Sequence, residues 1–144
     1  MPNEVIAIAC DHGGVDFKEI LKSDLEKMGY EVADLGCNDS SSVDYPDYAN
    51  KLADALKVGV AKRGVLVCGS GIGISIAANR HLHVRAALVH DALTARLCRE
   101  HNNANVLVLG GRTTGIAVAQ DCLKVFLDTD FEGDRHQRRI DKMS

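Results

Sequence analysis

The sequence predicts a Rossmann-like fold, a three-layer α/β/α sandwich around a five-stranded parallel sheet. Short apolar runs alternate with segments whose apolar residues recur at helical spacing along the whole chain. Strict alternation of strands and helices implies parallel strands, right-handed crossovers and helices on both faces of the sheet. The 144 residues are enough for one sizeable core, so we expect a single domain over 1–144.

Each element follows from a local pattern. Val5–Ala9 is an apolar run typical of a strand buried on both faces. Residues 15–28 place apolar side chains on one helical face, and a second strand is expected at 31–35. The polar segment 36–45 is long enough to be functional, and Pro46 favours a helix start after it. The same patterns predict the remaining elements: helix 48–60, strand 65–67, a helix ending near 80, strand 84–89, helix 91–100, strand 105–109, helix 113–127 and a short helix at about 131–142.

Composition excludes several classes of protein. The net charge of −3 argues against a broad nucleic-acid interface. No apolar stretch approaches the ~20 residues that a membrane span needs. Nothing resembles a signal peptide, so we expect a cytoplasmic protein without membrane or nucleic-acid partners. The five cysteines show no zinc-like spacing, so no metal site is expected.

The cysteines differ in their expected environment. Cys98 and Cys122 fall within helical patterns and are expected to be small buried side chains. Cys10 and Cys68 instead end apolar strands. Sites in α/β proteins are built at the carboxyl ends of strands, so these two positions are candidates for chemistry.

Three strand ends carry unusual chemistry: Cys10–Gly14, Cys68–Gly71 and Gly110–Arg112. In the first segment, Asp11 and His12 offer a carboxylate and an imidazole suited to proton transfer. The alternative is that Asp11 only caps a helix and His12 lies on the surface. Their position beside the glycine loop of the second segment favours the functional interpretation.

The loop at residues 68–75, CGSGIGIS, matches none of the common glycine-rich motifs. It lacks the lysine of a Walker loop. Ile74 stands where a dinucleotide fingerprint needs its third glycine, and also where a cysteine phosphatase needs its arginine. What remains is a strand-to-helix turn whose backbone N–H groups stabilise an oxyanion. The helix N-terminus favours a thiolate at Cys68 as base or nucleophile, and Ser70 adds a hydroxyl; the alternative is a structural turn with cysteine as filler.

The C-terminal segment 134–139 concentrates positive charge. On a helix, Arg135 and Arg139 lie one turn apart and form a phosphate clamp with Arg112, unless the segment is merely a solvated tail. His101 precedes the fifth strand and therefore belongs to the amino edge of the sheet, opposite the other candidates. A histidine there is usually a helix C-terminal cap. If His101 is catalytic, it serves the site of a neighbouring subunit, which predicts a dimer.

Taken together, several segments closely resemble the type B ribose-5-phosphate isomerases, a family that includes galactose-6-phosphate and allose-6-phosphate isomerases. The resemblance covers essentially the whole chain in order and rests on these segments: Cys10–Gly14, Asp44–Pro46, Cys68–Ser75, Ala77–Asn79, His101–Asn102, Gly111–Arg112 and Arg135–Arg139. It implies an aldose–ketose isomerase without metal or organic cofactor. It also implies a homodimer, or a tetramer of such dimers, with active sites shared between subunits.

The resemblance also implies roles for single residues. Cys68 resembles the base that moves a proton between C2 and C1 through a cis-enediolate. Some relatives use a glutamate where this chain has Ser75, so this chain looks like the cysteine type. Ser70 stands where many relatives have threonine and acts beside the backbone amides of the loop, which come from Gly69, Gly71 and Gly73.

Further roles concern the sugar ring and the phosphate. By the same resemblance, His101 opens the furanose ring with help from Asp11, while Tyr45 and Asn102 line the sugar pocket. The phosphate ligands implied are His12, Arg112, Arg135 and Arg139, the last two from the helix at about 131–142. Asp134 stands where many relatives have glycine.

Two other functions stay open from the sequence. The first is the same chemistry on a six-carbon 6-phosphate sugar, which depends on the length of the pocket. The second is a non-catalytic module of Rossmann-like architecture that binds a phosphate or a nucleotide.

Overall fold

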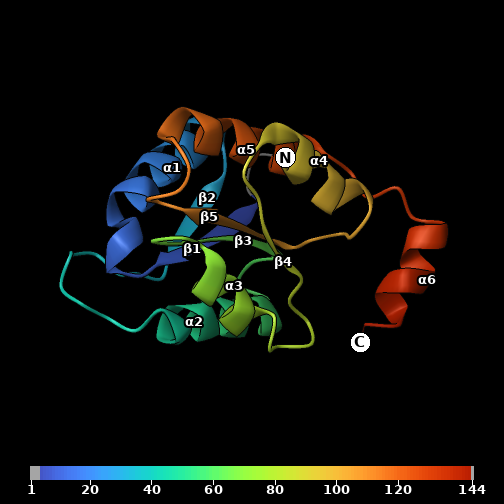
Figure 1. Ribbon diagram of the computed structural model, residues 1–144, viewed down its shortest axis with the longest axis horizontal. Helices are drawn as coiled ribbons and strands as arrows, with labels where there is room; N and C mark the ends of the chain where they lie inside the picture. Colours follow the sequence, from blue (N-terminus) through green and yellow to red (C-terminus); the bar gives the residue numbers. More distant parts are fainter. Residues whose placement is uncertain (1–3, 144) are drawn as a thin grey trace.

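The computed structural model describes residues 4–143, and its architecture confirms the predicted fold (Figure 1). One parallel sheet has the strand order β2-β1-β3-β5-β4. Its strands are β1 (Val5–Cys10), β2 (Glu31–Asp34), β3 (Arg63–Cys68), β4 (Ala86–Leu88) and β5 (Val106–Gly110). The order of winding reverses between β1 and β3, because β2 lies on one side of β1 and all later strands on the other. Such a switch point is where open α/β sheets bind ligands.

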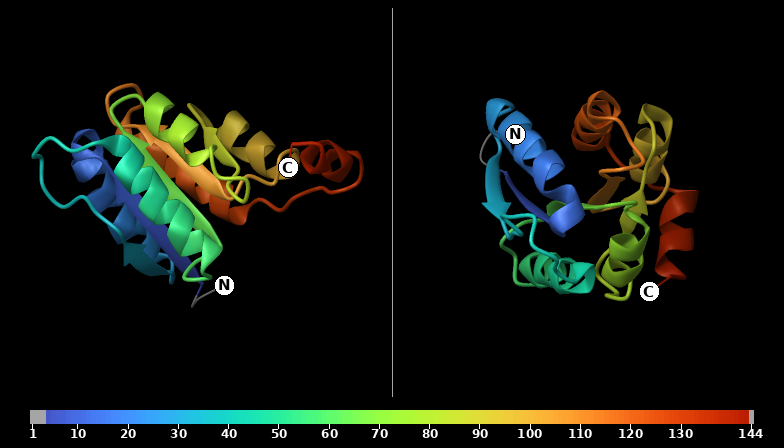
Figure 2. Two further views of the ribbon diagram at one scale, coloured as in Figure 1. Left: turned by 90° about the horizontal axis from the view of Figure 1, so that it is seen from below. Right: turned by 60° about the vertical axis from the view of Figure 1, so that its left-hand side comes forward.

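Helices cover both faces of the sheet. One face carries α1 (Val15–Lys27), α4 (Ala92–Glu100) and α5 (Ile116–Asp128), and the other carries α2 (Tyr45–Lys57) and α3 (Ile72–Ala78). A short 3₁₀ helix, η1 (His12–Gly14), follows β1. The last helix, α6 (Arg135–Asp141), stands apart from the three layers (Figure 2). Among the helices of residues 4–143, none combines the length and apolar composition that a membrane span requires.

The two faces of β1 carry side chains of different size. Ile6 and Ile8 belong to the core under α1 and α5, whereas Ala7 lies on the α2 face. Beside it in β3, a Cβ added to Gly64 would lie 2.9 Å from Leu52 of α2. Successive strand residues point to opposite faces, so this alternation lets α2 approach the sheet closely.

Several boundaries differ from the sequence prediction. Strand β4 is shorter than the expected 84–89, and α5 begins at Ile116 rather than at residue 113. Helix α2 begins at Tyr45 rather than Tyr48 and ends at Lys57, because Gly59 has a φ of 86° and stops it before Val60. The last helix starts at Arg135 rather than near 131. Gly133 and Asp134 just before it have φ angles of 76° and 51°, which no α-helix accommodates.

A buried ion pair ties α1 to the end of β2. Lys18 has no exposed side-chain surface, and its Nζ donates to Asp34 Oδ2 at 2.7 Å, to Glu19 at 2.8 Å and to Asn38 Oδ1 at 3.1 Å. Burial, the largest single effect, raises the pKa of Asp34, but the hydrogen bonds from Lys18, Gly36 N–H and Lys22 and the charge of Lys18 together outweigh it, so the net direction is downward. The pair therefore anchors the start of the 36–44 loop.

Removing one partner of this pair should destabilise the fold in a pH-dependent way. We expect Asp34→Ala to lower the free energy of unfolding by about 3 kcal/mol at neutral pH, because it leaves a buried ammonium without its main partner. Lys18→Met should cost less, since Lys22 still pairs with Asp34 at 3.3 Å. The folded pKa of Asp34 lies below the unfolded one, so its contribution is present above pH ~4 and is lost at lower pH. Denaturant unfolding at several pH values measures this; an Asp34→Ala deficit that stays constant down to the lowest pH would contradict it.

Candidate active site

Three carboxyl-end segments meet at the switch point of the sheet. The backbone N–H of Asp11 donates to Val67 O at 3.1 Å, which joins the β1 and β3 ends. Gly111 N donates to Cys68 O at 2.9 Å, and Arg112 N donates to Gly69 O at 2.8 Å, which joins the β3 and β5 ends. The strand ends predicted to carry chemistry therefore form one hydrogen-bonded edge.

Cys68 lies at the centre of this edge, at the end of the middle strand. Its side chain is only 4% exposed, and Sγ accepts a hydrogen bond from Gly71 N at 3.2 Å. Gly71 has a φ of 78°, a left-handed conformation that favours glycine, and a Cβ there would lie 3.1 Å from the Leu109 carbonyl carbon. The glycine therefore sets the turn that aims its N–H at the sulfur.

Ser70 takes part in the same turn. Its Oγ accepts a hydrogen bond from Ile72 N at 3.1 Å, in the first turn of α3. An accepting hydroxyl still has its own proton to donate. Ser70 therefore closes the turn before α3 with its side-chain oxygen and keeps a donor at the edge of the site.

Asp11 and His12 each have one structural bond. Asp11 is 7% exposed, and its Oδ1 accepts a hydrogen bond from Gly13 N at 2.9 Å. It therefore caps η1, the structural role that the sequence analysis gave as the alternative to proton transfer. His12 Nδ1 accepts from Val43 N at 3.1 Å, which fixes the ring against the loop before α2 and leaves the proton on Nε2. The hydrogen bonds of residues 4–143 involve neither Asp11 Oδ2 nor His12 Nε2. These two atoms are therefore available to a ligand.

Tyr45 and Arg112 flank the glycine loop. A Cβ added to Gly73 would lie 2.6 Å from Tyr45 Cζ, and only a glycine leaves room for this ring. A Cβ added to Gly69 would lie 3.7 Å from Arg112 Cδ, so the arginine side chain runs beside the loop. Arg112 is exposed, and a guanidinium next to backbone N–H groups forms an anion site.

The remaining predicted residues lie at the other edge of the sheet. His101 caps the C-terminus of α4 through its N–H to Leu97 O at 2.9 Å, and Asn102 beside it is exposed. The chain passes from these residues into β5 at its amino end. Because five strand residues span roughly 16 Å, His101 and Asn102 are about one strand length from the Cys68 edge.

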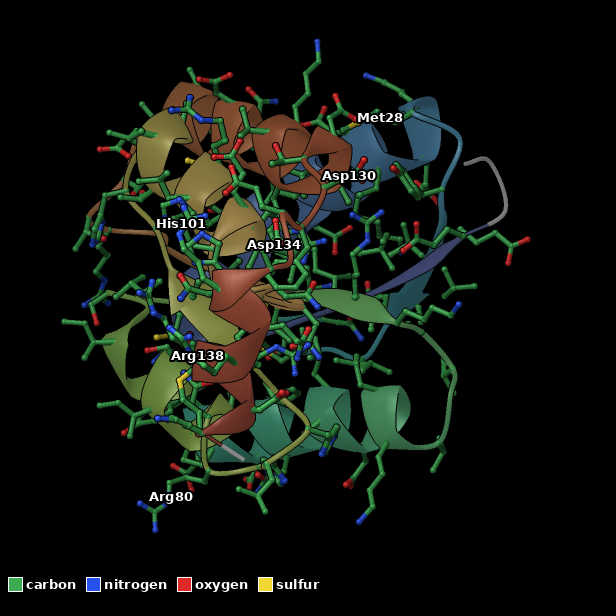
Figure 3. All side chains as sticks on the ribbon, turned by 90° about the vertical axis from the view of Figure 1, so that its right-hand side faces the viewer. Met28, Arg80, His101, Asp130, Asp134 and Arg138 are labelled. Atoms are coloured by element: carbon green, nitrogen blue, oxygen red, sulfur yellow. The ribbon has the colours of Figure 1, made fainter. Side chains whose placement is uncertain are left out.

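Helix α6 lies on the same side as His101 (Figure 3). Glu132 N donates to Glu100 O at 3.1 Å, which holds the preceding segment against the end of α4. His136 and Ile140 are buried, while Arg135 and Arg139 are exposed. The two arginines thus face outward, as a clamp for a ligand beyond this chain requires.

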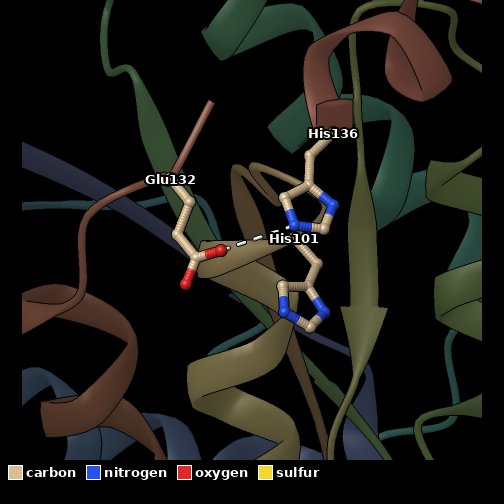
Figure 4. A group of neighbouring side chains, drawn as sticks. All are labelled: His101, Glu132 and His136. Atoms are coloured by element: carbon tan, nitrogen blue, oxygen red, sulfur yellow. Dashed lines mark ion pairs between the residues drawn. The ribbon is translucent and has the colours of Figure 1, made fainter. Parts of the chain in front are cut away.

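His136 stacks on His101 (Figure 4), and the sequence analysis gave it no role. Their ring centroids are 4.4 Å apart with an interplanar angle of 16°. His136 is 5% exposed; burial, then the charge of Arg135, lowers its pKa, so it is neutral at pH 7. Its spacing of four residues from Ile140 was the available sequence signal, because residues i and i+4 share one face of a helix.

His101, Glu132 and His136 have the residue types of a metal site. Their ligand atoms all lie within 4.8 Å of one another, and Glu132 Oε1 is 3.4 Å from His136 Nε2. Stacked rings direct their nitrogen lone pairs in parallel rather than toward one point, and Arg135 adds positive charge nearby. A cation needs converging ligands, so this arrangement suits a histidine stack better than a metal.

The other strand-end cysteine is part of the core. Cys10 is fully buried, and burial raises the pKa of its thiol to about 12. It points to the α1 and α5 face, whereas Cys68 points to the α2 and α3 face. Cys98 and Cys122 are buried as predicted, each with a pKa raised by burial to about 11. Of the two strand-end candidates, only Cys68 meets the glycine loop.

Comparison with known proteins agrees with this arrangement. A profile described as Ribose/Galactose Isomerase matches residues 6–143. Ribose-5-phosphate isomerase B of Escherichia coli is 40% identical over 139 residues, which cover 96% of this chain and 93% of the relative.

Two solved structures are similar along nearly their whole length. A ribose 5-phosphate isomerase from Thermotoga maritima has a TM-score of 0.95 at 48% identity, covering 97% of each chain. Ribose-5-phosphate isomerase B of Mycoplasma genitalium with bound ribulose-5-phosphate has a TM-score of 0.94 at 43% identity, covering 99% of this chain and 95% of the other. The chain therefore belongs to the ribose/galactose isomerase family.

Proposed function

We propose that this protein is a ribose-5-phosphate isomerase that interconverts ribose 5-phosphate and ribulose 5-phosphate. The observation that carries the proposal is Cys68 at the switch point, with its sulfur held by Gly71 N–H at 3.2 Å beside the Asp11 and His12 loop. The M. genitalium relative with bound ribulose-5-phosphate supports the choice of substrate. The family membership supports the reaction type.

Cys68 is the proposed base for the isomerisation step. Its thiolate takes the proton from C2 of the open-chain aldose, and the electron pair forms the C1–C2 double bond of a cis-enediolate. The resulting thiol returns the proton to C1, while the O2 proton moves to O1, so the product is the ketose and no redox partner is needed. The backbone N–H groups of residues 69–73 and the Ser70 hydroxyl stabilise the oxyanion.

Ring opening requires a separate group, because the resting aldose is cyclic. Asp11 is the proposed carrier of protons at the sugar oxygens, with its Oδ2 available. His101 is the proposed ring-opening residue, and the neutral His136 stacked on it holds its ring in place. Tyr45 and Asn102 complete the proposed sugar pocket.

The phosphate is assigned to four cationic or polar side chains. His12 and Arg112 come from the Cys68 edge, and Arg135 and Arg139 come from α6. Arginine forks bind phosphate oxygens in pairs, and phosphate binding energy positions the flexible open-chain sugar. The phosphate-binding arginines of the C-terminal helix are part of the single domain 1–144.

A homodimer reconciles the two edges. His101 and Asn102 lie about one strand length from Cys68 of the same chain, and α6 with Arg135 and Arg139 lies on the side of His101, so the proposal takes the second edge of each site from a partner. Large apolar side chains on α3, on α4 and between them are exposed and suit such an interface: Ile72 at 54%, Ile76 at 60%, Leu82 at 77% and Leu93 at 50%. A tetramer would combine two such dimers. The five free cysteines agree with a cytoplasmic location.

Substrate choice is the first test. Turnover of ribose 5-phosphate should exceed that of allose 6-phosphate and galactose 6-phosphate by at least about tenfold in kcat/KM, since a pocket rejects a misfitting carbon unit by roughly 1–3 kcal/mol. Coupled assays on the purified protein measure all three. A preference for either six-carbon sugar would replace the proposed substrate with that sugar and keep the mechanism.

Replacement of Cys68 tests the base. Cys68→Ala should fold, bind ribose 5-phosphate and lose about 10²–10⁴-fold in kcat, the usual contribution of a positioned acid–base group. Exchange of solvent deuterium into the substrate should fall with it. The matched control is Cys98→Ala, which removes a buried thiol from α4 and should lower stability but not turnover of folded protein. Near-normal turnover in Cys68→Ala would favour a non-catalytic binding module or another base.

Mixing inactive variants tests the shared site. Equal amounts of Cys68→Ala and His101→Ala, after subunit exchange, should regain about a quarter of wild-type activity, because half the dimers are mixed and one of their two sites is intact. Cys68→Ala mixed with Asp11→Ala is the control, since both residues lie at one edge and no intact site forms. Equal recovery in both mixtures, or none in the first despite demonstrated exchange, would argue against a site built from two chains.

A further inference from the structure

A second concave site lies at the amino edge of the sheet, away from Cys68. It is a cavity of about 620 Å³, within the range of small-molecule sites. Its charged lining consists of four cationic side chains, Lys62, Arg63, Arg85 and Arg99, and a single carboxylate, Glu4. Within residues 4–143 this cavity therefore has three positive charges in excess.

The carboxylate is already used by one of these arginines. Arg63 holds Glu4 in a bidentate pair, with Nε at 2.8 Å and Nη2 at 2.7 Å from its two oxygens. By contrast, the ion pairs found within residues 4–143 include neither Arg85 nor Arg99. Two partly buried guanidiniums therefore line one cavity without an ion-pair partner within residues 4–143.

Both unpaired arginines have N–H groups to spare. Arg85 donates through Nε to Asn103 O at 2.9 Å, and Arg99 donates through Nε and Nη1 to Thr129 O, Asn103 Oδ1 and Ala104 O. The hydrogen bonds of residues 4–143 involve neither terminal nitrogen of Arg85, nor Nη2 of Arg99. Burial and then repulsion from Arg63 lower the pKa of Arg99, and the charge of Asp130 offsets only part of this effect. Each guanidinium is thus fixed at one end and open at the other.

We propose that this cavity is a binding site for a small phosphate-bearing anion, separate from the substrate site. The two free terminal nitrogens of Arg85 form one donor fork, and Nη2 of Arg99 adds further N–H donors beside it; such guanidinium donors match phosphate oxygens. Lys62 adds a point charge at the rim. A volume of about 620 Å³ holds more than one phosphate group, so the class of ligand is a phosphorylated metabolite or a pyrophosphate compound.

Binding at this site would alter the anchoring of the loop that carries His101. The same two arginines hold Asn103, a residue with a φ of 47°, through its backbone oxygen and its side chain. Asn103 lies two residues after His101. An anion bound to Arg85 and Arg99 therefore changes how residues 101–105 are anchored. Any effect of this change on turnover, but not the binding itself, rests on the proposed role of His101.

Calorimetric titration with inorganic pyrophosphate tests the binding site. The titration uses full-length protein carrying Arg112→Met and Arg139→Met, which removes two proposed substrate-phosphate ligands. One pyrophosphate per chain should still bind. Adding Arg85→Met should weaken this binding at least tenfold, whereas Arg80→Met, the same change at an exposed arginine outside the cavity, should not alter it. Glu4→Gln should tighten it, because it removes the one carboxylate and frees the Arg63 fork.

The outcomes separate this site from the substrate site. No binding in the Arg112→Met, Arg139→Met background, or binding insensitive to Arg85→Met, overturns the proposal whatever the enzyme's activity. If Arg85→Met does not fold, as judged by circular dichroism, Lys62→Met takes its place and should weaken binding several-fold; no weakening overturns the proposal. Backbone amide resonances of residues 101–105 should shift with saturation of the cavity, and only with an intact Arg85.

Discussion

The parallel sheet imposes the constraint on which the rest of this protein depends. All five strands point the same way, so every strand ends at one edge and every strand begins at the other. Backbone hydrogen bonds from Asp11 to Val67 and from Gly111 to Cys68 then join the strand ends into one surface. Any residue placed just before β5 must lie a strand length away. Separation of Cys68 from His101 is therefore a property of the topology rather than of side-chain detail.

This separation explains why chemistry that needs both groups is expected to use two chains. The Cys68 edge holds a sulfur with an N–H donor, a carboxylate and an arginine, which together suit proton transfer at a carbon next to a carbonyl. The His101 edge holds an imidazole and two outward arginines. In the proposed mechanism, neither set alone binds and opens a cyclic sugar phosphate. A symmetric pair makes two complete sites from two incomplete chains, so dimerisation and activity would be coupled.

Buried and partly buried cationic side chains of this fold differ in whether they have an ion-pair partner. Lys18 is fully buried but is neutralised by Asp34, and the pair secures the loop that leads toward Tyr45. Arg85 and Arg99 are only partly buried and have no carboxylate partner within residues 4–143, yet they anchor Asn103. The first arrangement stabilises a structure that is already complete. The second arrangement leaves positive charge that a bound anion can neutralise. For this reason we interpret the amino-edge cavity as an anion-binding site.

Much of the fold and half of the site follow from the sequence, because their physics is local. Apolar periodicity predicted the strands and helices, and glycines after β1, β3 and β5 identified the strand ends that meet. Local pattern was less reliable at helix ends: Val58 and Val60 continue an apolar pattern that Gly59 interrupts with a φ of 86°. The C-terminal helix likewise starts late, since Asp134 has a φ of 51° just before it.

The sequence by itself determined the fold class, the candidate residues and the edge to which each belongs, since strand order along the chain dictates the end at which a residue emerges. Only the tertiary structure decided which candidates have a working environment. Cys10 and Cys68 look alike in sequence, but side-chain parity buries one thiol under α1 and gives the other an N–H donor from Gly71. The His136 stack on His101 and the charge excess around Arg85 depend on segments far apart in the chain. Long-range packing brings such groups together, and no local pattern encodes it.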